Sequence, residues 1–158
     1  MKIANGAVAL ALACALLTGC NNGGDQPPRN TASTGGSDVS AKTAQEALAR
    51  GGLSLPQGAE KSTLATIDGT PYLKAYLVTF SAPRSAAVDF CSTGDLGGDL
   101  PALKLSEEER QLLGANAKPD GARYCSSQLP SNSAWNRTVL VENGDPALVR
   151  VSVAQMGR

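Results

Sequence analysis

The sequence predicts an α+β fold in which a small antiparallel sheet of about four strands, formed by two hairpins, packs with two to three short helices. Two observations support this fold class. Two pairs of β-prone segments each enclose a tight-turn sequence, which is typical of a hairpin. Helix start and stop signals lie before the first pair and between the two pairs, so strands do not alternate with helices as they would in a parallel sheet.

The first helix is expected to begin at Ser40, whose side chain can cap it, and to end near Arg50 at the Gly51-Gly52 pair. The first hairpin follows, with strands at 61–67 and 72–80 joined by a turn at 68–71. Its second strand is predicted to be central in the sheet, because both faces are apolar. Tyr72, Tyr76, Val78 and Phe80 fall on one face, and Leu73, Ala75 and Leu77 fall on the other.

A second helix is expected from Arg84 to about Cys91. Pro83 is tolerated in the first turn of a helix, where its missing N–H costs nothing. The helical spacing then places Ala87, Phe90 and Cys91 on one buried face.

Residues 92–101 are expected to form a loop, and a third helix follows it. Ser106 and Glu109 match a capping box, in which each side chain hydrogen-bonds the other residue's backbone N–H. This helix is expected to end near Gly114. The glutamates at 107–109 are therefore assigned a structural role at a helix N-terminus, where the helix dipole favours negative charge.

The second hairpin is predicted from strands at 137–142 and 147–154 around a turn at 143–146. The last strand alternates, with Val149, Val151 and Val153 on one face and Arg150 and Ser152 on the other. This pattern predicts a sheet covered on one side only. Trp135 precedes the strand and is expected to cap the core, the alternative being a surface anchor for a partner.

Cys91 and Cys125 are predicted to form a disulfide, with Cys125 in a coil-rich stretch that the bridge would hold against the second helix. The alternatives are a metal pair and a reactive thiol. Two cysteines 34 residues apart, without CxxC spacing and without His, make a poor zinc site.

The N-terminal residues are typical of a secretory signal peptide. Lys2 precedes an apolar run over residues 3–17, which is shorter than the roughly 20 residues that a membrane-spanning helix needs. The run ends in Leu17-Thr18-Gly19-Cys20, which resembles the bacterial lipobox. The resemblance implies diacylglycerol transfer to the Cys20 thiol, cleavage after Gly19, and acylation of the new amine.

Three segments are therefore predicted. Residues 1–19 are the lipoprotein signal peptide, and residues 20–40 are the lipidated cysteine followed by a flexible tether. The tether is rich in Gly, Asn, Ser and Thr and has too few apolar side chains to form a core. Residues 41–158 are expected to form a single globular α+β domain.

The amino-acid composition limits the partners and the kinds of catalysis that can be expected of the protein. Fourteen Lys and Arg balance fourteen Asp and Glu without a basic stripe, which argues against a nucleic-acid partner. The chain has no His, which removes the commonest general base and every Ser-His or Cys-His pair. Asp89, Asp95 and Asp99 are near one another, but their spacing does not match a calcium loop, and solvated loop acids are the preferred interpretation.

The function expected from these features is that of a membrane-anchored, extracytoplasmic lipoprotein that binds an envelope protein or a small ligand without catalysis, cofactor or metal. The alternatives are a structural wall component and a glycan hydrolase using paired carboxylates such as Asp89 and Asp99. The segments at 46–60 and 76–91 are also similar to small uncharacterised actinobacterial lipoproteins, which implies the outer leaflet of the plasma membrane. In a bacterium with two membranes, the residue after Cys20 is Asn21 rather than Asp, so export of the lipoprotein to the outer membrane is an alternative.

Overall fold

The computed structural model describes residues 42–69, 71–102 and 104–157. Within these residues the chain forms three helices and six strands. Their bounds are α1 Ala44–Arg50, β1 Glu60–Thr66, β2 Tyr72–Ala82, α2 Arg84–Ser92, β3 Leu100–Pro101, α3 Glu107–Leu113, β4 Arg123–Leu129, β5 Asn132–Val141 and β6 Ala147–Met156. The predicted signal peptide, Cys20, the tether and Ser40 lie outside the described residues.

The strands form one antiparallel sheet in the order β1-β2-β6-β5-β4-β3. The α+β class and both predicted hairpins, β1-β2 and β5-β6, are confirmed. The two hairpins join where β2 pairs with β6, which makes β2 a central strand as predicted. The estimate of about four strands is too low for the described residues, because β3 and β4 extend the sheet beyond β5.

Strand β4 corrects the expectation that Cys125 lies in coil. Residues 123–129 pair with β5 over almost their full length, and β5 begins at Asn132, five residues before the predicted start. Few apolar residues mark β4, so its strand conformation depends on the backbone hydrogen bonds offered by β5. Strand β3 consists of the last two residues of the predicted loop 92–101 and adds a short edge to β4.

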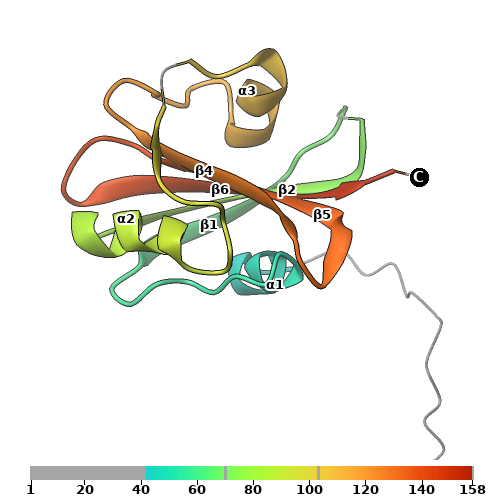
Figure 1. Ribbon diagram of the computed structural model, residues 1–158, viewed down its shortest axis with the longest axis horizontal. Helices are drawn as coiled ribbons and strands as arrows, with labels where there is room; N and C mark the ends of the chain where they lie inside the picture. The colour runs from blue at the N-terminus through green and yellow to red at the C-terminus, as the bar shows by residue number, and fades with distance from the viewer. Residues whose placement is uncertain (1–41, 70, 103, 158) are drawn as a thin grey trace, which may run out of the picture. The chain divides into compact units, whose positions relative to one another are not determined.

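Helices cover both faces of the sheet. Figure 1 shows α1 and α2 on one face and α3 on the other. The prediction of a sheet covered on one side is therefore wrong. Arg150 and Ser152 of β6, assigned to a solvated face, are both buried, because α3 packs against β2, β5 and β6 on that side.

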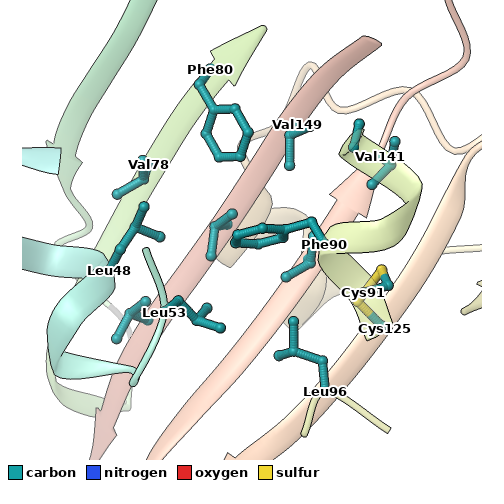
Figure 2. Close-up of a cluster of buried hydrophobic side chains, with 14 of the residues drawn as sticks. Leu48, Leu53, Val78, Phe80, Phe90, Cys91, Leu96, Cys125, Val141 and Val149 are labelled. Carbon is teal, nitrogen blue, oxygen red and sulfur yellow. A yellow bond between two sulfur atoms is a disulfide. The ribbon is translucent and has the colours of Figure 1, made fainter. Parts of the chain in front are cut away.

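The main core lies between the sheet and the α1/α2 layer. Figure 2 shows its centre, where Leu48 of α1 and Phe90 of α2 point toward Val78, Phe80 and Val149 of the strands. The rings of Phe80 and Phe90 meet edge to face with centroids 5.7 Å apart, a favourable aromatic geometry. Trp135 is also buried in this cluster, as expected for a residue that caps the core.

Hydrogen bonds to the first backbone N–H groups mark where each helix begins. Thr43, not Ser40, caps α1, since its side chain accepts a hydrogen bond from the Glu46 backbone N–H at 3.1 Å. Helix α2 spans the predicted residues, and its first N–H donates to the Asp145 carboxylate in the β5-β6 turn. The predicted capping box between Ser106 and Glu109 is confirmed.

Candidate functional site

The two cysteines lie where the sequence predicts them to meet. The Cys91 and Cys125 sulfur atoms are 2.18 Å apart, and the Cα atoms are 5.7 Å apart. The bridge joins the last turn of α2 to β4 within the main core (Figure 2). Cys125 is only 2% exposed, so it lies in packed sheet rather than in irregular chain.

Beside the disulfide, Arg137 of β5 is buried on the α1/α2 face and is only 1% exposed. Its guanidinium donates to three loop carbonyls, those of Gly51, Gly94 and Asp95. It also donates to the Ser127 hydroxyl and the Gln128 carbonyl of β4. Burial lowers the pKa of Arg137, and the charge of Asp95 opposes that shift. Arg137 therefore fastens the ends of α1 and α2 to the sheet.

On the opposite face, four polar side chains of β4 and β5 line a groove of about 230 Å³. The register pairs Ser126 with Thr138 and Gln128 with Asn136, so two hydroxyls and two amides share one face of the sheet. Tyr72 of β2 also lines this hollow. We call these five residues the polar groove.

The polar groove borders the N-terminal turn of α3 through two tyrosines. The Tyr72 hydroxyl donates to the Glu108 carboxylate at 2.6 Å. Burial raises the pKa of Tyr124 to about 12, and its hydrogen bond to Glu109 acts in the same direction. Burial opposes ionisation of Glu109, but hydrogen bonds from Tyr124 and Ser106 outweigh it and hold the pKa of this carboxyl below its ordinary value. Two consecutive glutamates of α3 thus each hold one tyrosine.

The C-terminal end of α3 is held by a buried ion pair. Arg150 of β6 donates to the Glu142 carboxylate at 2.6 Å, and both side chains are less than a tenth exposed. Arg150 also donates to the Leu113 carbonyl at the end of α3, while Glu142 accepts from the Lys118 backbone N–H. Both ends of α3 are therefore fixed to the sheet by polar contacts, and α3 leaves the polar groove open beside its first turn.

The acids singled out in the sequence are separated from the polar groove. Asp89 is exposed on α2, and Asp99 accepts a hydrogen bond from Arg123 at 2.7 Å. The Asp95 carbonyl accepts from Arg137. Within the described ranges, no group of three or more His, Cys, Asp or Glu side chains is placed to hold a metal ion. A second cleft, of about 370 Å³, is lined by two exposed carboxylates, Glu60 and Asp145.

Sequence reasoning did not identify the polar groove. Ser126 and Gln128 lie in the stretch interpreted as coil, and Asn136 lies just before the strand predicted at 137–142, so these side chains could not be assigned to one face. Tyr72 was placed on the face of Tyr76, but the register between β2 and β6 shifts between Tyr72 and Lys74. This irregularity moves Tyr72 to the α3 face, where it packs against the small cluster around Ala75.

Comparisons with protein-family models, curated proteins and solved structures found no match for this chain. No helix in the part of the chain that the structure describes is long and apolar enough to cross a membrane. The resemblance to actinobacterial lipoproteins therefore stays a prediction from the sequence.

Proposed function

We propose that the protein is a membrane-anchored lipoprotein of the extracytoplasmic face, whose folded domain is a non-catalytic binding module. The observation that carries this proposal is the lipobox Leu17-Thr18-Gly19-Cys20 at the end of a short apolar run. One acyl chain holds a protein to a bilayer only reversibly, whereas two or three chains anchor it stably. The lipid on Cys20 is thus the contact with the membrane, and an envelope protein or small ligand is the partner of the domain.

Two features of the domain support a binding role. The disulfide-distance pair Cys91–Cys125 suits an oxidising compartment outside the cytoplasm. The polar groove presents the hydroxyl of Ser126 and the amides of Gln128 and Asn136 to solvent in a concave site, and a few placed polar groups orient the ligand in many binding proteins. The charge balance of the chain offers no basic surface for nucleic acid.

Metabolic labelling with a fatty-acid probe tests the anchor. Cys20→Ala is expected to abolish the label and to leave uncleaved precursor, because the thiol is the acyl acceptor. Cys14→Ala is the matched control, since it removes a cysteine from the same apolar run and should keep the label. Unchanged labelling of Cys20→Ala would remove the lipoprotein proposal.

A glycan hydrolase using paired carboxylates is the second candidate, and one observation favours it. Glu60 and Asp145 line the same cleft, as the two acids of such an enzyme must. Release of reducing ends from purified cell-wall glycan tests this activity. Glu60→Gln should abolish the release and Asp89→Asn, on exposed α2, should not. No release by the unmodified protein would exclude this candidate.

A further inference from the structure

The polar groove has the dimensions and the chemistry of a subsite for one sugar ring. In an antiparallel pair, side chains directly opposite are about 5 Å apart, and side chains two residues apart on a strand are about 7 Å apart. Ser126, Thr138, Gln128 and Asn136 therefore form a four-cornered set of hydrogen-bonding groups on the scale of a pyranose. Asn136 already hydrogen-bonds Tyr72, and the hydroxyls of Ser126 and Thr138 hydrogen-bond Tyr124, but an amide or hydroxyl so engaged can make a further hydrogen bond. The hollow of about 230 Å³ is smaller than the roughly 300–1,000 Å³ that encloses a drug-sized ligand.

The charges around the polar groove disfavour an anionic ligand. Arg137 also lines the hollow, but its guanidinium is buried on the opposite face and engaged by backbone carbonyls. Among the residues that the structure describes, no other Lys or Arg lines this hollow, so a phosphate or carboxylate would meet no available cation from them. Glu108 stands nearby, held by Tyr72, and would repel an anion.

The hydrogen-bonding groups of the polar groove also exclude an apolar ligand. An alkyl chain laid on Gln128 and Asn136 would strip water from two amides and satisfy neither, at a cost in free energy. A sugar hydroxyl can both donate and accept, as the amides and hydroxyls of the polar groove also can. Tyr72 adds a phenol ring, whose apolar body and polar tip suit a ring bearing both C–H and O–H groups.

One buried atom beside the polar groove is consistent with a polar occupant. The Ser152 hydroxyl oxygen is buried and has no hydrogen-bond partner among the described residues. Ser152 lies directly opposite Thr138 in the β5-β6 register, so the two side chains share the α3 face. Buried hydroxyls nearly always have a partner, so the interior wall of this face retains unused hydrogen-bonding capacity.

We propose that the polar groove binds a single ring of an uncharged saccharide, with the rest of the glycan extending into solvent. This proposal deepens the binding role proposed above and rests on it only for the source of the glycan, which would be the cell envelope. Binding itself does not need the lipid, so it can be tested on a chain that cannot be lipidated.

The test is a titration of the purified chain carrying Cys20→Ser, in a detergent that contains no sugar. The probes are maltotriose, cellotriose and N-acetylchitotriose, with a trigalacturonate as the charged control. NMR spectra follow the side-chain amides of Gln128 and Asn136. We expect at least one neutral probe to shift both amides with a saturable Kd at or below the millimolar range, and the trigalacturonate to shift neither.

Two variants locate the site. Gln128→Ala truncates an exposed side chain and should weaken binding about 10-fold or more, without altering the melting temperature. Ser62→Ala, on the exposed edge strand β1, should leave the Kd unchanged. The proposal is overturned if no neutral probe shifts these amides at 20 mM, if Gln128→Ala binds normally, or if acetylated trialanine amide shifts them and the sugars do not. The last result would assign the polar groove to a peptide.

Discussion

The two faces of the sheet differ in how much apolar surface they bury. The α1/α2 face is one continuous apolar cluster, which takes side chains from β2, β4, β5 and β6 together with the disulfide. The α3 face has two small clusters, one around Leu113 and Leu140 and one around Ala75 and Ala154. Beyond these clusters lie the hydroxyls and amides of the polar groove.

Each face also contains a buried arginine, and the two are satisfied differently. Arg137 on the α1/α2 face donates to carbonyls and one hydroxyl, without a hydrogen bond to a carboxylate. Arg150 on the α3 face pairs with Glu142. The first arrangement fixes loops against an apolar core, whereas the second fixes one short helix and leaves neighbouring sheet uncovered. We therefore expect most of the stability of the domain to come from packing on the α1/α2 face. The α3 face, which is less fully covered, is then available for binding.

The largest effect is expected from Arg137→Ala. The change removes the donors of three loop carbonyls and of the Gln128 carbonyl in a buried site, and each unsatisfied polar group carries a penalty. We expect the unfolding free energy to fall by about 3–5 kcal/mol, because several buried carbonyls lose their donor together and each unsatisfied group costs about 1–3 kcal/mol. Urea denaturation measures this loss.

Arg123→Ala is the matched control. Arg123 pairs with Asp99 at 2.7 Å, but its side chain is 34% exposed, so solvent screens the pair and the loss should be much smaller than for Arg137→Ala. Equal losses for the two variants would show that the α1/α2 face does not depend on Arg137.

The next largest effect is expected from Cys91→Ser. Closing a loop over a sequence separation of 34 lowers the entropy of the unfolded chain, which stabilises the fold by about 3–4 kcal/mol in the chain-entropy model. Thermal melts with and without reductant, on the mature protein that begins at position 20 and has Cys20 replaced, measure the effect. Reductant should lower the melting temperature of the parent and leave Cys91→Ser unchanged. Two free thiols in the untreated, denatured parent would contradict the disulfide.

The order of these effects reflects what the sequence could and could not predict. Local signals were sufficient for α2, where Pro83 and the spacing of Ala87, Phe90 and Cys91 predicted both the bounds and the buried face. They were sufficient for α3, because a capping box is contained within four residues. The two hairpins were predicted from their turns for the same reason.

The missed features depend on contacts between distant residues. Strand β4 becomes a strand through pairing with β5, since Ser126, Ser127 and Gln128 carry little strand preference of their own. Burial of Arg150 depends on α3, which precedes β6 by about 35 residues, and on a partner at Glu142 that the alternating pattern of β6 does not reveal. The polar groove combines β2, β4 and β5, so it required the sheet order as well as the register.

A smaller effect, on the α3 face, is expected at alkaline pH. The pKa of Tyr124 is raised from its ordinary value near 10 to about 12 in the folded protein, first by burial and then by the hydrogen bond to Glu109. The unfolded chain therefore loses this proton first, so the contribution to stability is complete below pH 10 and is lost as the pH rises from 10 to 12. Because Tyr124 is only half-buried, we expect a contribution of about 1 kcal/mol.

Melting temperatures of the parent and Tyr124→Phe between pH 9 and 11.5 isolate this contribution. Titration of the lysines and other tyrosines is common to both proteins, so it cancels in the difference. The parent should lose more stability than Tyr124→Phe over this interval, and parallel curves would show that Tyr124 titrates normally.

The smallest effect is expected from Ser152→Ala. The substitution on the α3 face is expected to leave the unfolding free energy unchanged or to raise it, whereas those on the α1/α2 face lower it. The Arg137 guanidinium makes five hydrogen bonds through its two terminal nitrogens, although its Nε has no partner among the described residues. The Ser152 hydroxyl is the whole polar group of its side chain, and it is buried without a partner among the same residues, with Ser152 only 1% exposed. Removing an unsatisfied buried hydroxyl should leave stability unchanged or raise it by up to about 1 kcal/mol.

Thr138→Val is the control from the same cross-strand pair, because the Thr138 hydroxyl hydrogen-bonds Tyr124. That variant should lose about 1 kcal/mol. If Ser152→Ala instead loses as much as Thr138→Val, the Ser152 hydroxyl has a bound water or another partner.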